Sequence, residues 1–254
     1  MFMNYLDELV KTIQILRSPQ GCPWDREQTH SSIRENMLEE AYEAVEAIDE
    51  KNPEHLKEEL GDVLLQVLLH SQIAKDEGEF DIQDVAKMLN DKLIYRHPHV
   101  FKDTNVKNSN DVVVNWEKLK EKEKPQRKNT LDGIAKTLPS LMRAMKISKK
   151  AARKGFEWAK FEDVLACFKS EIEEFLSADS QKEKEEEFGD ILFSLVNVAR
   201  WSKIDPEFAL QIANEKFRQR FTILENLANK PLDELSIEEY DILWQQAKKL
   251  QKNS

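Results

Sequence analysis

The chain has 254 residues, which allows one large domain or two small ones. It carries 38 Lys and Arg against 48 Asp and Glu, so its formal net charge of −10 leaves no basic surplus for a nucleic-acid backbone. With 34% charged residues, 40% hydrophobic residues and only 6 Gly and 8 Pro, the composition favours long amphipathic helices over a turn-rich β protein. We therefore expect an all-α protein without general nucleic-acid binding.

The N-terminus and the cysteines indicate a cytoplasmic protein. Asp7 and Glu8 stand where a signal peptide needs a basic and then an apolar stretch, and no uncharged run approaches the ~18 residues of a membrane span. The two cysteines, Cys22 and Cys167, belong to no Cys-x-x-Cys pair. We expect no membrane association, no disulfide and no zinc site, which fits a reducing cytoplasm.

A helix and then a helical hairpin are predicted in the first half. The helix has apolar residues at helical spacing: Leu6, Leu9, Ile13 and Leu16. The turn of the hairpin falls at residues 49–53. Each arm carries two carboxylates three residues apart, and therefore on one helix face: Glu40 and Glu43, then Glu59 and Asp62. Because the arms are antiparallel, the four carboxylates can meet across the gap.

The rest of the first half predicts a shorter helix, a turn and a linker. The helix that carries Lys92 and Arg96 should end at Pro98, because proline disfavours helix in the residue before it. His97 and His99 flank this proline, and we interpret them as part of a turn because the second half lacks them. Residues 122–129 are charged and contain a proline, as linkers do. We place the domain boundary at residue 128, giving domains 1–128 and 129–254.

The second half repeats the motifs of the first in the same order. Its first helix should begin around Pro139, with Leu141, Met142, Met145 and Ile147 at helical spacing. Four of the 6 glycines and four of the 5 tryptophans fall in the repeated motifs, so chance is a poor explanation and we predict a duplication. The pairs are Gly21-x-x-Trp24 and Gly155-x-x-Trp158, Glu40-x-x-Glu43 and Glu171-x-x-Glu174, Glu59-x-Gly61-Asp62 and Glu187-x-Gly189-Asp190, Lys92-x-x-x-Arg96 and Lys216-x-x-x-Arg220, and Trp116-x-x-x-Lys120 and Trp244-x-x-x-Lys248.

The paired carboxylates suggest a metal site. In an acidic chain an isolated Glu-x-x-Glu is usually a solvated face. Here residues 63–69 and 191–196 are apolar almost all round, which predicts buried helices whose acidic beginnings need a partner. Oxygen ligands without His or Cys select Mg²⁺ or Mn²⁺ over Zn²⁺ or copper, and a di-iron site would need His where Asp62 and Asp190 stand. Magnesium in a helical cleft points to phosphate chemistry.

Common nucleotide-binding motifs are absent, whereas a set of other motifs resembles one family. No GxxxxGK[ST] or GxGxxG loop occurs, which excludes kinases and P-loop NTPases. The two Glu-x-x-Glu pairs followed by ELGD or EFGD, together with RHPHVF, NEKFxxRF and WQQAKK, resemble the MazG family of nucleoside triphosphate pyrophosphohydrolases in its long tandem form. The resemblance covers nearly the whole chain. It implies two all-α domains, assembly as a dimer, and Mg²⁺-dependent conversion of a nucleoside triphosphate (ATP included) or deoxynucleoside triphosphate to the monophosphate and pyrophosphate, which clears unwanted nucleotides.

The resemblance also implies roles for individual residues. The metal ligands would be Glu171, Glu174, Glu187 and Asp190, with Glu40, Glu43, Glu59 and Asp62 as the equivalent set. Lys216, Arg220, Trp244 and Lys248 match positions that contact the nucleotide, and local cations and an aromatic plane suit a polyanionic nucleotide. Cys167 departs from the family pattern, because a basic residue is expected one turn before Glu171.

Alternatives remain open for both the residues and the function. Trp244 could pack in a core, and Lys216 and Arg220 could lie on a solvated face. An acidic scaffold for a basic partner would need neither metal nor Gly61 and Gly189. A nucleotide phosphatase would release orthophosphate.

We favour in-line attack of a metal-activated water on the α-phosphorus, mainly in the second half. There the helix continues past Arg220, and a cationic stretch at residues 146–154 precedes the carboxylates.

Overall fold

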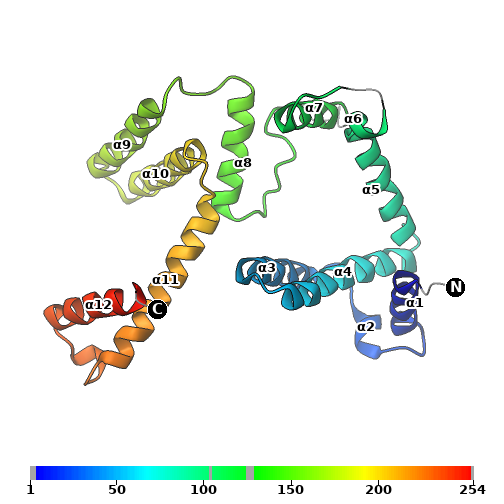
Figure 1. Cartoon of the computed structure of the whole chain (residues 1–254), viewed down its shortest axis with the longest axis horizontal. Coiled ribbons are helices and arrows are strands. Elements are labelled where there is room, and N and C mark those ends of the chain that lie inside the picture. The colour runs from blue at the N-terminus through cyan, green and yellow to red at the C-terminus, as the bar shows by residue number, and fades with distance from the viewer. Residues whose placement is uncertain (1–3, 103–104, 124–128, 253–254) are drawn as a thin grey trace. The chain divides into compact units, whose positions relative to one another are not determined.

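The computed structural model describes residues 4–102, 105–123 and 129–252, and every regular element in these ranges is a helix. This confirms the predicted all-α class. The chain divides into two units, residues 1–124 and 125–254 (Figure 1). The predicted boundary at residue 128 lies outside the described residues. Within the described ranges, no helix combines the length and apolarity needed to cross a membrane.

The first unit is organised around a long helical hairpin. Arms α3 and α4 pack side by side, and α1 packs against α4 (Figure 1). The core of this unit joins Ile13 of α1 and Ile33 to apolar residues of α4, such as Leu68 and Ile73. The elements are α1 (Tyr5–Arg17), α2 (Pro23–Glu27), α3 (Arg34–Glu50), α4 (Pro53–Asp76), α5 (Ile82–Arg96), α6 (Pro98–Phe101) and α7 (Ser109–Lys122).

The turn of this hairpin is shorter than the sequence suggested. Helix α3 continues to Glu50, and Lys51 ends it in the left-handed conformation with φ of 57°. The side chain of Asn52 then accepts hydrogen bonds from the first backbone amides of α4, and Pro53 occupies the first helical position. Two residues therefore reverse the chain where we expected five, because the cap at Asn52 starts the next helix at once.

The second unit repeats the hairpin and adds a long helix behind it. Arms α9 and α10 pack together, α8 packs on α10, and α12 packs on α11. Helix α8 starts directly after Pro139, as predicted, and Ser180 and Glu183 form a capping box at the start of α10. The elements are α8 (Ser140–Arg153), α9 (Phe161–Ser177), α10 (Gln181–Trp201), α11 (Pro206–Leu227), a 3₁₀ turn η1 (Leu232–Glu234) and α12 (Ile237–Lys252).

The helices that carry the repeated basic residues differ in length as predicted. Helix α5 ends at Arg96, and the short α6 begins at Pro98. Its counterpart α11 continues seven residues beyond Arg220 to Leu227. The proline therefore interrupts the first copy at the point where the second copy remains helical.

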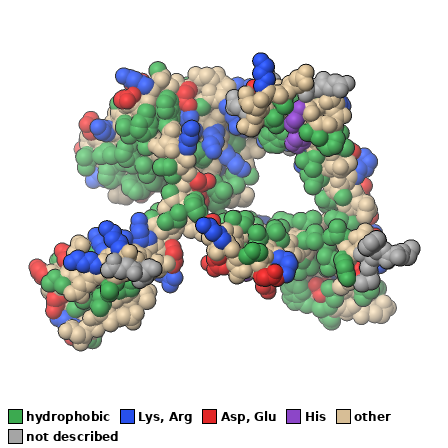
Figure 2. Space-filling view, in the orientation of Figure 1, with side chains coloured by type: hydrophobic (Ala, Val, Ile, Leu, Met, Phe, Trp, Pro, Cys, Tyr) green, Lys and Arg blue, Asp and Glu red, His purple; other side chains and the backbone are tan. Residues whose placement is uncertain are grey.

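The expectation that residues 191–196 are buried all round was wrong for one side of α10. Ser194 and Val196 are buried, but Leu192 is 41% exposed and Leu195 is 45% exposed. The reason is that α8 and α9 cover only part of the circumference of α10. Figure 2 shows the resulting hydrophobic surface over α9 and α10.

Candidate functional site

The α3–α4 hairpin brings together three of its four predicted carboxylates. Oxygen atoms of Glu40 on α3 and of Glu59 and Asp62 on α4 all lie within 4.8 Å of one another. Glu59 is buried, while Glu40 and Asp62 are half-buried. Glu43 lies outside this close group and is exposed, but its charge still acts on the other members.

The α9–α10 hairpin forms the same cluster from the equivalent residues. Oxygen atoms of Glu171 on α9 and of Glu187 and Asp190 on α10 also lie within 4.8 Å of one another. Asp190 is exposed and the other two are half-buried. Glu174, like its counterpart in the first unit, is exposed and lies outside the close group. Each of the two hairpins therefore brings three carboxylates close together, with a fourth on the same helix face nearby.

The electrostatics of both clusters favour a bound cation. Removal from water, followed by the charges of Asp62 and Glu43, raises the pKa of Glu40. Burial and then Glu174 and Asp190 raise the pKa of Glu187 in the same way. Burial therefore disfavours the ionised carboxylates first, and repulsion from their neighbours adds to this; a divalent cation would offset both effects. An all-oxygen donor set suits a hard cation such as Mg²⁺.

An imidazole enters the first cluster, and the sequence reasoning missed it. His55 Nε2 lies 3.1 Å from Glu59 Oε1, and its Nδ1 lies 2.8 Å from Glu50 Oε2. A hydrogen bond to Glu50 is the main cause that raises the pKa of His55. At the equivalent place the second unit has Glu183, which caps α10. The sequence spacing could have indicated this contact, because His55 stands four residues before Glu59 and therefore lies on the same helix face.

The predicted nucleotide-contacting residues gather on α11 and α12. The ring of Trp244 on α12 lies 5.2 Å from that of Phe217 on α11. Arg220 Nε donates a 2.7 Å hydrogen bond to Gln251 Oε1, while Lys216 is exposed and Lys248 is half-buried. Figure 2 shows Lys and Arg side chains gathered over α12 and the adjoining part of α11.

This cationic set and the carboxylate cluster remain separate within the second unit. Across the described residues, no hydrogen bond or ion pair joins Lys216, Arg220, Trp244 or Lys248 to the cluster on α9 and α10. Trp244 is half-buried against Phe217, so part of its surface is engaged in packing, as the alternative interpretation held.

The equivalent residues of the first unit make different contacts. Arg96 on α5 lies over the ring of Trp116 on α7, 5.0 Å from its centroid, and the Lys120 ammonium lies 4.7 Å from the same ring. Arg96 donates through Nε to both carboxylate oxygens of Glu123 at 3.0 Å. Gln251 occupies the equivalent place in the second unit, 128 residues later. A carboxylate therefore neutralises the first arginine, whereas the second bonds a neutral amide.

Cys167 faces the second cluster, although the sequence suggested no role for it. Its thiol donates a 3.7 Å hydrogen bond to Glu171 Oε1. Burial and the neighbouring Glu171 carboxylate raise the pKa of this thiol. Cys167 therefore places a neutral donor beside Glu171, at the position where the resemblance led us to expect a basic residue.

Comparisons with known proteins decide the family. A family profile for the MazG nucleotide pyrophosphohydrolase domain matches residues 28–101, which include the first carboxylate cluster. The nucleoside triphosphate pyrophosphohydrolase/pyrophosphatase MazG of Thermotoga maritima is 47% identical over 246 residues, covering 95% of each chain. The chain belongs to the MazG family.

Other relatives match nearly the whole of this chain. The nucleoside triphosphate pyrophosphohydrolase of Escherichia coli K12 is 41% identical over 258 residues, covering 97% of this chain and 98% of the relative. A Bacillus subtilis protein named YabN is 50% identical over 250 residues, but the match spans 51% of its length. The family resemblance and the tandem all-α fold expected from the sequence are thereby confirmed. The individual site residues stay predictions.

Proposed function

We propose that this chain hydrolyses nucleoside triphosphates to the monophosphate and pyrophosphate with Mg²⁺ as cofactor, Mn²⁺ being a possible substitute. The observation that carries the proposal is the duplicated convergence of three carboxylate oxygens within 4.8 Å in a chain of the MazG family. Substrates would include ATP and deoxynucleotides, and the product pattern would suit removal of unwanted nucleotides.

The carboxylates would hold the metal ion. Glu171, Glu187 and Asp190 would be its ligands in the second unit, with Glu174 beside them, and the first unit has the matching set. When bound, Mg²⁺ supplies charge neutralisation for the leaving pyrophosphate and a water of lowered pKa. The carboxylates would also orient that water for in-line attack on the α-phosphorus, which is the geometry of phosphoryl transfer.

The cationic set would bind the rest of the nucleotide. Lys216 and Arg220 lie four residues apart on α11, so both can face one triphosphate. The exposed part of the Trp244 ring would stack on the base. Lys248, one turn after this tryptophan, would add a further positive charge.

The backbone beside each cluster leaves room for the nucleotide. Gly61 and Gly189 each stand directly before the aspartate of their cluster, and a Cβ at either position would meet nothing within 4 Å. A helix-interior glycine costs about 0.5–1 kcal/mol relative to Ala. Because packing within the chain does not require a glycine at either position, the cost supports a role in which a ligand closely approaches the helix backbone.

A homodimer would complete the site. The cationic set makes no hydrogen bond or ion pair with its own cluster among the described residues, so a second copy could supply it. The exposed apolar side of α10, which includes Phe188, Leu192 and Leu195, provides a surface for such an assembly.

Product analysis with a panel of ribonucleotides and deoxynucleotides tests the function. We expect pyrophosphate and a monophosphate in the presence of Mg²⁺, and neither product in EDTA. Orthophosphate with a diphosphate would instead identify a phosphatase. An absence of turnover with every nucleotide and metal would favour the acidic scaffold.

Expressing the two halves separately tests where the activity lies. Residues 129–254 should retain most of the pyrophosphate release, whereas residues 1–128 should retain little and act in assembly or regulation. Circular dichroism must first show that each half is helical. A folded first half that outpaces the second would contradict this assignment.

A further inference from the structure

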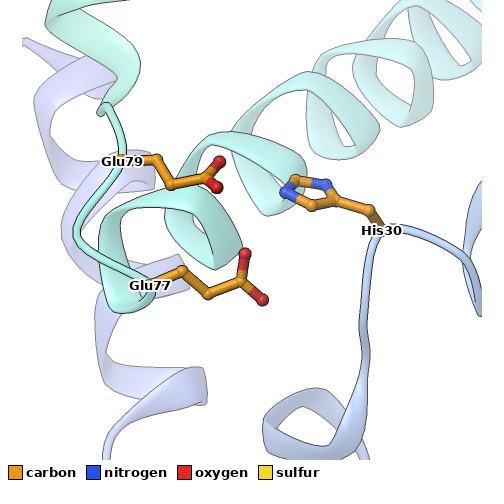
Figure 3. A group of neighbouring side chains, drawn as sticks. All are labelled: His30, Glu77 and Glu79. Carbon is orange, nitrogen blue, oxygen red and sulfur yellow. The ribbon is translucent and has the colours of Figure 1, made fainter.

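A third group of potential metal ligands lies in the first unit, outside both carboxylate clusters. It contains His30, in the loop between α2 and α3, and Glu77 and Glu79 at the end of α4. One ligand atom of each residue lies within 4.8 Å of the others. Figure 3 shows the three side chains pointing toward one another from two separate segments of the chain.

The two glutamates stand on a fixed backbone. They flank Gly78, whose φ of +76° ends helix α4 in the left-handed conformation. The Glu79 amide donates to the Ala74 carbonyl at 2.9 Å and the Gly78 amide to the Lys75 carbonyl at 3.1 Å, which is the Schellman pattern. The turn therefore presents both carboxylates on the same side of the helix end.

The imidazole is oriented by a second histidine. His30 Nδ1 lies 2.8 Å from His70 Nδ1, and the two rings are nearly parallel, with centroids 5.1 Å apart and an angle of 7° between their planes. One of these nitrogens must carry the proton and the other must accept it. This contact occupies Nδ1, so Nε2 on the opposite edge of the ring of His30 faces the carboxylates (Figure 3).

The loop that carries His30 is itself held in place. The Thr29 amide donates to Ser32 Oγ at 2.9 Å, and the Ser32 amide donates to Thr29 Oγ1 at 3.2 Å. The next residue, Ile33, is 1% exposed and belongs to the core. Both sides of the group are therefore anchored to the packed part of the unit before any ligand binds.

We propose that His30, Glu77 and Glu79 form a binding site for a divalent transition-metal ion, with His70 as a positioning residue behind the imidazole. A ligating histidine whose other ring nitrogen is hydrogen-bonded is the usual arrangement in metal sites. The ion would join the loop before α3 to the end of α4. It would thereby fasten the open end of the hairpin, opposite the turn at Lys51 and Asn52.

The donor set distinguishes this site from the carboxylate clusters. An imidazole nitrogen favours ions such as Zn²⁺, Ni²⁺ or Co²⁺, whereas Mg²⁺ and Mn²⁺ suit oxygen ligands. The ligand atoms lie within 4.8 Å of one another, so small side-chain rotations bring them to metal–ligand bonds of about 2.0–2.2 Å. Glu77 and Glu79 are exposed and free to make this adjustment.

Titration of the EDTA-treated full chain with Co²⁺ in excess Mg²⁺ tests the proposal. The excess Mg²⁺ competes with Co²⁺ for the all-oxygen carboxylate clusters, so the visible absorption of protein-bound Co²⁺ reports mainly on sites that contain nitrogen. We expect the parent chain to bind a Co²⁺ ion. This binding should be lost in His30→Gln and in the double variant Glu77→Gln with Glu79→Gln. His70→Phe, which retains an aromatic ring, should weaken binding by about 10- to 100-fold, as loss of an outer-shell partner does.

A matched control excludes other histidines. His97 and His99 have rings 5.6 Å apart on a different segment, and His55 lies 3.1 Å from Glu59 in the first carboxylate cluster. His99→Gln and His55→Gln therefore each remove a possible competitor without touching the proposed site. Both variants should bind Co²⁺ like the parent. Circular dichroism and thermal unfolding verify that each variant is folded. The proposal is overturned if the parent binds no Co²⁺ under these conditions, if His30→Gln binds it unchanged, or if only His99→Gln or His55→Gln loses it.

Discussion

The two units share one hairpin and one carboxylate cluster, yet they differ in the charges that surround them. In the first unit, His55 lies against Glu59, and Glu123 bonds Arg96. In the second unit, the corresponding places hold Glu183, turned into a helix cap, and Gln251. The first copy therefore pairs Glu59 with an imidazole and Arg96 with a carboxylate, whereas in the second copy Arg220 bonds a neutral amide. We therefore expect the second copy to bind an anionic ligand more readily than the first.

The sharpest test of this comparison removes equivalent carboxylates from each unit. Glu171→Ala or Asp190→Ala should lower Mg²⁺-dependent pyrophosphate release by more than about 100-fold, because a ligand contributes at least as much as an outer-shell partner. Glu40→Ala or Asp62→Ala should leave most of the activity. Initial rates at limiting Mg²⁺ measure both effects, with circular dichroism as the check on folding. Full activity in both second-unit variants would refute the site.

The next effect concerns the triphosphate. Lys216→Ala should raise KM by roughly 10- to 100-fold, since a charge-assisted contact contributes about 1.5–3 kcal/mol. Lys92→Ala, the matched change in the first unit, should leave KM unchanged. Steady-state kinetics over a range of nucleotide concentrations distinguish the two. Equal KM values for the parent chain and Lys216→Ala would show that Lys216 is only a surface charge.

A smaller change exchanges the partners of the two arginines. Gln251→Glu should neutralise Arg220 as Glu123 neutralises Arg96, and raise KM by about tenfold. Gln251→Asn keeps the amide neutral and serves as the control. The reverse change, Glu123→Gln, should leave the kinetics unaltered while lowering the stability of the first unit. If Gln251→Glu has parental kinetics, the charge difference between the units does not explain their roles.

The sequence predicted the positions of the helices better than the tertiary contacts around them. Motif spacing located both hairpins and the start of α8, because carboxylates three apart and a proline at a helix start follow from local geometry. The repeats also marked both clusters, although Glu43 and Glu174 lie outside the close groups. The exposed side of α10 could not be predicted, because an apolar run in the sequence does not determine how many helices pack against it.

The contacts of His55 and Glu123 depend on side-chain conformation and on tertiary packing. Neither residue recurs in the other copy, so the repeated motifs do not include them. His55 becomes informative only when it lies against Glu59. Glu123 becomes informative only when the packing of α5 and α7 brings it to Arg96. Differences between the copies, more than their shared motifs, therefore carry the functional information.

The smallest effect is a pH dependence of the metal-free protein. The pKa of Glu187 is raised from 4.5 by burial and then by Glu174 and Asp190, so the native state holds its proton to higher pH than the unfolded state. The free energy of unfolding should therefore fall as pH rises from 4.5 to the raised pKa of the native state, because Glu187 then ionises among like charges. Glu187→Gln removes that loss. In EDTA, its thermal midpoint should exceed that of the parent near pH 7, and the two should converge below pH 4.5. Glu173→Gln, an exposed change on α9, should follow the parent at every pH. An advantage for Glu187→Gln that persists unchanged at low pH would show that the carboxylates of this cluster do not repel one another.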